Sequence, residues 1–216
     1  MLRFAASVAL ALAPALGMPA DAPAAPTEDA ASPLRLMELS RRLYETGRAL
    51  EDPLLLLAAA ELRRSVDLRP AAPRGRVAEA ATDAAVLTWQ AILDAARAVA
   101  GEDPAVARLI ADTEDARPRG LVTGPVYSIA VLEGAGTARH GPYPFAAADF
   151  AEVYVEGEGT SNLDLFVRDA QGRLVCADTD LSDIAHCGWR PAEAGDFTVI
   201  VRNLGTAANR YALMTN

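Results

Sequence analysis

Residues 163–180 read LDLFVRDAQGRLVCADTD, and this stretch decides the fold of the chain. In LDLFVR (163–168) the odd-numbered residues are aliphatic, whereas the even-numbered ones are Asp, Phe and Arg. A period of two is typical of a strand with one face in a core and the other in solvent. The same alternation occurs in AEVYVE (151–156) and in FTVIVR (197–202). Short alternating strands separated by turn residues predict an antiparallel β-sandwich in the last third of the chain.

The stretch 163–180, together with CGWRPAEAGDFTVIVRNLG (187–205) and NRYALMTN (209–216), resembles the bacterial pre-peptidase C-terminal domain. The matching positions are Leu163, Asp164, Leu165, Gly172, Asp178, Asp180, Trp189, Pro191, Gly195, Asn203, Asn209, Tyr211 and Asn216. The resemblance spans about residues 145–216 and implies a compact sandwich of jelly-roll type on a secreted bacterial protein. It brings no catalytic residues. We expect no peptidase domain upstream, although one often precedes this module.

The N-terminus has the pattern of a secretion signal. Arg3 supplies a positive charge, and the apolar stretch 4–17 is too short to span a bilayer comfortably. We expect cleavage after Ala20, so that 1–20 is a signal peptide and the Ala- and Pro-rich segment 21–32 is a leader. The alternative is an uncleaved membrane anchor, against which Pro14 argues because it interrupts the apolar run. We therefore expect a periplasmic or secreted protein with no membrane insertion after signal cleavage.

The formal net charge of −9 limits the classes of partner. An acidic chain repels nucleic acids and anionic lipid surfaces. We therefore expect no nucleic-acid partner, which leaves an unknown protein or a polysaccharide.

The two cysteines, Cys176 and Cys187, both lie in the strand-rich part of the chain. Two cysteines in an exported protein usually form one disulfide. We expect the pair to face each other across two antiparallel strands, and closing so short a loop is worth roughly 3 kcal/mol. The alternative is a reactive thiol, or a metal-binding pair helped by His186.

Residues 33–116 have the pattern of a small helical bundle. Ser32-Pro33, Asp52-Pro53 and Asp103-Pro104 each place an N-cap residue before a proline at the first helical position. The predicted helices cover about 33–50, 53–68, 76–100 and 103–115. Together with a sandwich at 117–216, the fold class is α+β, with the helical bundle first and a jelly-roll-like antiparallel β-sandwich after it. We expect the two halves to be separable, with a fragment from about residue 118 folding alone.

The first predicted helix carries a leucine stripe, and the second opens on a run of leucines. The stripe at Leu36, Leu39, Leu43 and Leu50 predicts an inward face, with the arginines 41, 42 and 48 outside it. The run 54–57 is interpreted as core, with a partner-docking groove as the alternative.

Most catalytic signatures are absent from the sequence. It contains no Gly-x-Ser-x-Gly elbow, no His-Glu-x-x-His and no phosphate-binding glycine loop. Of the two histidines, His140 lies in a Gly/Pro-rich connector and His186 adjoins Cys187. We interpret both as ordinary residues and expect the protein not to be an enzyme.

An acidic loop is the best candidate for a ligand site. Asp178, Asp180 and Asp183 lie within six residues, and Asn162 and Asp164 lie on a strand that we expect nearby. Calcium takes six to eight oxygen ligands, which such a loop can supply in part. The alternative is a set of structural turns, because Asp and Ser bond their own backbone there. Apart from calcium, we expect no cofactor.

Four aromatic residues are candidates for an outward face of the sandwich, namely Tyr143, Phe145, Tyr154 and Phe166. Outward aromatics can form a platform for sugars or peptides. More often they cover a neighbouring element, here the helical part.

The leading hypothesis is an exported, non-enzymatic protein whose sandwich is a stabilising or interaction module and whose helical part offers a partner surface. The alternative is a calcium-dependent module that binds carbohydrate or matrix protein, and the third is a hydrolase with an unrecognised site. A cleft holding a histidine with two polar partners would favour the enzyme, and clustered carboxylates would favour calcium. A packed helix–sandwich interface with neither would favour the interaction hypothesis.

Overall fold

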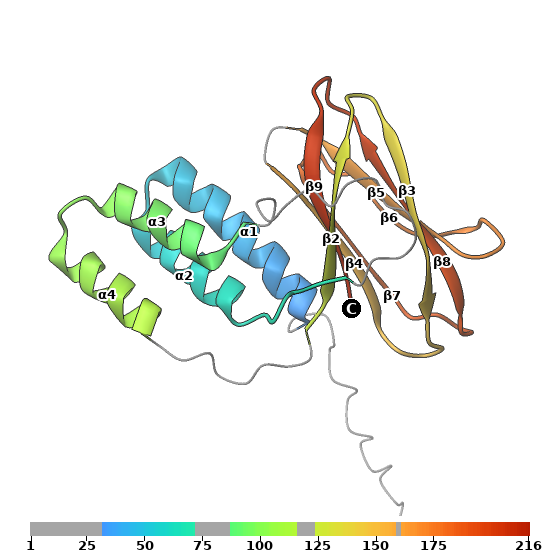
Figure 1. The fold of residues 1–216 in the computed structure, drawn as a ribbon, viewed down its shortest axis with the longest axis horizontal. Coiled ribbons are helices and arrows are strands. Elements are labelled where there is room, and N and C mark those ends of the chain that lie inside the picture. Colours follow the sequence, from blue (N-terminus) through green and yellow to red (C-terminus); the bar gives the residue numbers. More distant parts are fainter. Residues whose placement is uncertain (1–31, 72–86, 116–123, 159–160) are drawn as a thin grey trace, which may run out of the picture.

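The computed structural model describes residues 32–71, 87–115, 124–158 and 161–216. Four helices precede the main strands: α1 (Pro33–Leu50), α2 (Pro53–Arg64), α3 (Trp89–Ala100) and α4 (Pro104–Asp115). The predicted α+β class is confirmed. Figure 1 shows the helices gathered on one side of the sandwich. The predicted signal peptide, and the leader except for Ser32, lie outside the described residues.

The three predicted helix starts are confirmed by their caps. The side chains of Ser32, Asp52 and Asp103 each accept a hydrogen bond from a backbone N–H two or three residues further on. A proline follows each cap at the first helical position, where a missing N–H is harmless.

Two predicted helix boundaries differ from the structure. Helix α2 ends at Arg64 and not at 68, because the chain turns there and then forms the two-residue strand β1 (Arg69–Pro70). Helix α3 begins at Trp89, since Thr88 has an extended backbone and caps it. The part of the predicted third helix at 76–86 lies outside the described residues.

Eight further strands build the sandwich. They are β2 (Val126–Leu132), β3 (Thr137–Phe145), β4 (Ala151–Gly157), β5 (Leu163–Arg168), β6 (Leu174–Asp178), β7 (Ile184–Trp189), β8 (Gly195–Asn203) and β9 (Asn209–Thr215). One sheet, here called the helix-side sheet, has the order β1-β2-β9-β4-β7, and the other, the outer sheet, has the order β3-β8-β5-β6. All pairs except β1–β2 are antiparallel. Without β1, this nested order is that of an eight-stranded jelly roll.

The inward faces of the two sheets meet in one apolar core. For the neighbouring strands β5 and β8 the predicted alternation is confirmed on the core side, since Leu163, Leu165 and Val167 of β5 are buried there together with Phe197, Val199 and Val201 of β8. Trp189 closes this core through an edge-to-face contact with Phe145 and a tilted contact with Phe197.

The helices α1, α2, α3 and α4 share a second core. Its buried members are Leu56, Leu57, Ala59, Ala60, Ile92, Leu93, Ala96, Val106 and Ile110. Gly47 lets α1 and α2 approach closely, because a Cβ there would lie 2.9 Å from a carbon of Leu56. The leucine run at 54–57 therefore serves mainly as core, although Leu54 itself is exposed.

The inward face of α1 differs from the predicted leucine stripe. Leu39 and Leu50 are exposed, whereas Leu34, Met37 and Arg41 are buried. The reason is that α1 has two neighbours: one face packs on α2 and another on the helix-side sheet. An arginine predicted outside the core thus lies inside the molecule.

A third apolar cluster joins the helices to the sandwich. Leu34 and Met37 of α1 pack on Tyr154, Ile184 and Met214 of the helix-side sheet. As a result, every residue of β4 is buried on both faces. The predicted solvent face of this strand, Glu152, Tyr154 and Glu156, is therefore wrong: helices cover it.

Candidate functional site

Two buried carboxylates lie where the helices cover the helix-side sheet. Glu152 and Glu156, both on β4, are 1% and 3% exposed. A carboxylate withdrawn from water is strongly destabilising unless charges and hydrogen bonds replace the lost hydration. The neighbours of these two residues therefore define the interface.

Glu156 is neutralised by arginines from two helices. Arg63 of α2 donates to both of its carboxylate oxygens, at 2.9 and 3.1 Å, and Arg41 of α1 lies 3.6 Å away. The Tyr154 hydroxyl donates a third hydrogen bond at 3.0 Å. Burial, reinforced by the Glu156 charge, raises the pKa of Tyr154 well above its ordinary value, so its hydroxyl stays a donor.

Glu152 bonds to the start of α1 and to His186 of β7. The Ser32 hydroxyl, which caps α1, donates to Glu152 Oε1 at 2.6 Å, and His186 Nε2 lies 3.0 Å from the same oxygen. Serine and histidine thus meet on one carboxylate oxygen, and they are not arranged as a serine–histidine–acid relay, in which the imidazole would contact the hydroxyl. The group ties a helix cap to a strand.

The position of His186 bears on the enzyme hypothesis. Its side chain is only 2% exposed. It lies in a packed helix–sandwich interface and not in a cleft that a substrate could enter. Of the three observations that discriminate between the hypotheses, the packed interface is the one found here.

His140 of β3 forms a second histidine contact inside the sandwich. Its Nε2 lies 2.6 Å from the Tyr211 hydroxyl. Burial lowers the pKa of His140 and raises that of Tyr211. A neutral imidazole therefore accepts a hydrogen bond from the Tyr211 hydroxyl, and the contact satisfies the polar atoms of a buried tyrosine and a partly buried histidine.

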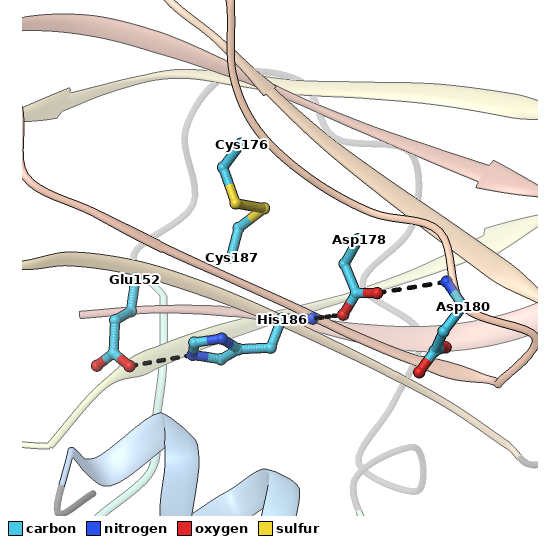
Figure 2. Close-up of a disulfide and its surroundings, with 6 residues drawn as sticks. All are labelled: Glu152, Cys176, Asp178, Asp180, His186 and Cys187. Atoms are coloured by element: carbon cyan, nitrogen blue, oxygen red, sulfur yellow. Dashed lines mark hydrogen bonds and ion pairs between the residues drawn. A yellow bond between two sulfur atoms is a disulfide. The ribbon is translucent and has the colours of Figure 1, made fainter. Parts of the chain in front are cut away.

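Cys176 and Cys187 form a disulfide with a Cα–Cα distance of 5.9 Å (Figure 2). The sequence predicts that the two cysteines face each other across one antiparallel pair, and this detail is wrong. Cys176 lies on β6 of the outer sheet and Cys187 on β7 of the helix-side sheet. The bond therefore links the two sheets along one side of the sandwich, and a cross-link of this kind holds the layers together.

The three aspartates of the acidic loop have separate partners. Figure 2 shows Asp178 accepting from the backbone N–H of His186, at 2.8 Å. The Asp180 carboxylate lies 3.5 Å from Arg42 of α1. Asp183 is buried and accepts a hydrogen bond from the Asn209 amide. Each carboxylate thus holds a different part of the molecule.

The other two residues of the predicted calcium site lie at the start of β5. Asp164 is buried, and its pKa is raised by burial and by the Asp178 charge, against the opposing effect of Arg202. The backbone carbonyl of Asn162 accepts a hydrogen bond from the backbone N–H of Leu204. Within the described ranges, no three His, Cys, Asp or Glu side chains are grouped so that they could hold a metal ion. A calcium site therefore stays the alternative to structural turns at this loop.

The four candidate aromatics do not share one face. Tyr154 lies under α1, and Tyr143 and Phe145 pack against the core of the sandwich. Phe166 lies on the outward face of the outer sheet and is partly exposed, and the Arg202 guanidinium lies 5.7 Å from its ring centre. A platform made of all four is therefore not formed.

Sequence reasoning missed Glu152, Glu156, Arg41 and Arg63, which carry the interface. A signal was present in AEVYVE (151–156), where a tyrosine separates the two acids on one strand face. Acids and tyrosine are also ordinary on a solvated face, so the pattern alone could not identify a covered one.

The surface of the helical part carries two open troughs. One, of about 400 Å³, lies between α3 and α4 and is lined by Arg97, Ala100, Gly101, Ala107, Ile110, Ala111 and Glu114. The other, of about 440 Å³, is lined by Arg48, Glu51, Ala95, Ala98 and Val99. Neither includes a histidine or a residue of the acidic loop.

No family model matches the chain, and no curated protein matches it in sequence. Similar solved structures include the pre-peptidase C-terminal domain of a collagenase from Bacillus anthracis, at 14% identity over 42% of this chain and 87% of that one, with a TM-score of 0.33. Another is PliG, a periplasmic inhibitor of g-type lysozyme from Aeromonas hydrophila, at 13% identity over 45% and 91%, with a TM-score of 0.31. At these scores the likeness carries no argument about function. The jelly-roll assignment rests on the strand order of the chain itself.

Proposed function

We propose that the protein is an exported, non-enzymatic interaction protein whose jelly-roll sandwich holds a helical partner-binding surface in a fixed orientation. The observation that carries this proposal is the helix–sandwich interface, where Glu156 is buried with Arg41 and Arg63. Breaking a buried ion pair leaves an uncompensated charge and costs about 3–5 kcal/mol. The interface therefore resists separation and fixes the helices on the sandwich.

The non-enzymatic part of the proposal is supported by how the candidate catalytic groups are used. His186 is bonded to Glu152 under α1, and His140 is bonded to Tyr211. Export is supported by the disulfide, which persists in oxidising compartments. None of the described helices is long and apolar enough to cross a membrane.

The trough between α3 and α4 is the surface we assign to the partner. Its floor consists of small and apolar residues, Ala100, Gly101, Ala107 and Ala111 with Ile110, and the Arg97–Glu114 ion pair lies at its side. An apolar trough with a polar rim is typical of a surface that receives a side chain of another molecule.

The proposal is tested with immobilised mature protein and an extract of the source cells. Ala107→Arg and Ala111→Arg fill the trough at exposed positions without disturbing the core. The matched control is Ala192→Arg, at an exposed position between β7 and β8. We expect a partner that is captured by the wild type and by the control, and lost from both trough variants. Equal capture by all four proteins would refute the assignment of the trough as the partner-binding surface. Turnover of a substrate by the purified protein would refute the non-enzymatic role.

A further inference from the structure

The outer sheet has one face that no described element covers. Helices cover the helix-side sheet, whereas β3 and β8 lie on the far side of the sandwich (Figure 1). By strand alternation and register, the outward residues of this face are Thr137 and Arg139 of β3, Thr198, Ile200 and Arg202 of β8, Asp164, Phe166 and Arg168 of β5, and Leu174, Val175 and Ala177 of β6, where a register shift brings Leu174 opposite Arg168. Asp196 and Pro144 lie at its end.

This uncovered face is locally basic in an otherwise acidic chain. It carries three arginines, Arg139, Arg168 and Arg202, from three adjacent strands, against two aspartates, whereas the whole chain has a net charge of −9. One of the two aspartates, Asp164, is buried beside Arg202. The positive charge is therefore at the surface, and part of the negative charge lies below it.

An aromatic ring lies among these guanidinium groups. The Arg202 guanidinium is 5.7 Å from the ring centre of Phe166, and Phe166 is directly opposite Ile200 in the sheet. Arg139 is opposite Ile200 on the other side, so Arg139 and Phe166 are two strands apart, about 10 Å. Arg139 is exposed, and no other described residue forms an ion pair or hydrogen bond with its side chain. Across the neighbouring strands β3, β8 and β5, the surface thus presents the charged Arg139, the apolar Ile200 and the aromatic ring of Phe166 in turn.

We propose that this face of the outer sheet binds an acidic polysaccharide, a sugar chain that carries carboxylate groups. A guanidinium group pairs with a carboxylate through two parallel hydrogen bonds. A partly exposed phenyl ring offers an apolar surface on which the apolar face of a sugar ring can lie. A uronate chain repeats a carboxylate and an apolar ring face along its length. A sheet surface can bind such an extended chain.

Other anionic partners fit the same face less well. Nucleic acids and anionic membranes have a denser negative charge than a uronate chain, which carries one carboxylate per sugar ring, so the acidic remainder of the protein repels them more strongly. A stable protein interface needs a well-packed apolar centre. Here the exposed apolar side chains Leu174, Val175 and Ala177 lie on the edge strand β6, whereas at the centre Ile200 is buried and Phe166 only partly exposed. The proposal goes beyond the partner trough on the helices and does not depend on it, because the two surfaces lie on different elements.

The test uses the full mature protein and polygalacturonate as the probe, with its methyl-esterified form as the neutral comparison, in affinity electrophoresis at low salt. We expect binding to the acid form only, weakened by added salt. The double variant Arg139→Gln/Arg202→Gln should weaken it at least tenfold. The control Arg48→Gln/Arg108→Gln has the same loss of charge at exposed positions of α1 and α4 and should bind like the wild type.

Two further variants keep the test decisive if the double variant folds poorly. Arg139→Gln alone removes a side chain that holds nothing else in place, and it should weaken binding several-fold with an unchanged melting temperature. Phe166→Leu should also weaken binding while it leaves the charge unchanged. The proposal is overturned if the wild type does not bind polygalacturonate, if the control double variant loses as much affinity, or if single-stranded DNA of equal charge competes equally well. None of these outcomes bears on the trough between α3 and α4, which is tested with a separate set of variants.

Discussion

Glu156 is a carboxylate withdrawn from water, and two arginines with one tyrosine hydroxyl replace the water. Glu156 and Arg63 depend on each other, because Arg63 is itself buried and has Glu156 as its counter-charge. Such pairs contribute little net stability compared with apolar residues of the same shape, but a broken pair is strongly destabilising. At the scale of single residues, this carboxylate is where the interface is most sensitive.

We predict that Glu156→Gln lowers the free energy of unfolding by about 3–5 kcal/mol, because it leaves two buried arginines with only the exposed Glu45 to face Arg41. Urea denaturation followed by circular dichroism measures the change. The matched control is Glu61→Gln, which removes an exposed partner of Arg64 and should change stability by no more than about 0.5 kcal/mol. Equal effects of the two substitutions would contradict a buried ion pair.

His140 predicts a pH dependence with a definite sign. Its pKa in the folded protein is lowered by burial, so the unfolded chain binds the proton more tightly. Stability is complete above the unfolded value of about 6.5 and falls as the pH drops below it, by at most about 1.4 kcal/mol per pH unit. His140→Gln keeps an acceptor for the Tyr211 hydroxyl and should flatten the curve below about pH 6.5. An identical slope of unfolding free energy against pH in the wild type and the variant would show that His140 does not cause the pH dependence.

Several single-residue roles were predictable and others were not. The residues that cap helices follow from their identity and their place before proline, because capping is a local interaction. That the two cysteines bond follows from their number in a chain that is expected to be exported. That they join different sheets does not, because a short loop between strands can stay in one sheet or cross to the other.

At the scale of elements, β4 is the strand on which both halves of the molecule meet. Its inward face lies in the sandwich core and its outward face bonds to α1 and α2. Local alternation indicates which residues share a face, but what covers that face is decided by distant parts of the chain. For the same reason β5 and β8 were predicted correctly on their core side, whereas the covered acids of β4 were not.

The acidic loop between β6 and β7 gives a prediction about calcium. Three crowded carboxylates gain from a cation only if they are free to turn toward it, and here Asp178, Asp180 and Asp183 are each engaged with a different protein group. We therefore predict the same melting temperature in millimolar calcium and in chelator. A bound ion at a hundredfold excess over its dissociation constant would instead add about 2.7 kcal/mol, or several degrees. If such a rise occurred and Asp180→Ala abolished it, the calcium alternative would hold.

At the scale of the whole molecule, the helices and the sandwich form one body. The strand β1 leaves the helical part and pairs with β2, an apolar cluster fills the interface, and two buried carboxylates bond across it. A fragment beginning at residue 118 would expose Tyr154, Ile184 and Met214 together with both acids. That the sandwich folds alone stays a prediction, and the covered surface argues against it; the sequence does not show how much of that surface the helices cover.

The central claim, that helices and sandwich unfold as one unit, is tested most directly with the two tryptophans. Trp89 lies at the start of α3 and Trp189 in β7, so Trp189→Phe leaves a fluorescent reporter only in the helices and Trp89→Phe leaves one only in the sandwich. Each variant is unfolded in urea and followed by fluorescence and by circular dichroism. We predict that the fluorescence midpoint coincides with the circular dichroism midpoint in both variants, as for a single cooperative transition. If the fluorescence midpoint of the helical tryptophan differed from that of the sandwich tryptophan, or either differed from the circular dichroism midpoint, the account would be contradicted.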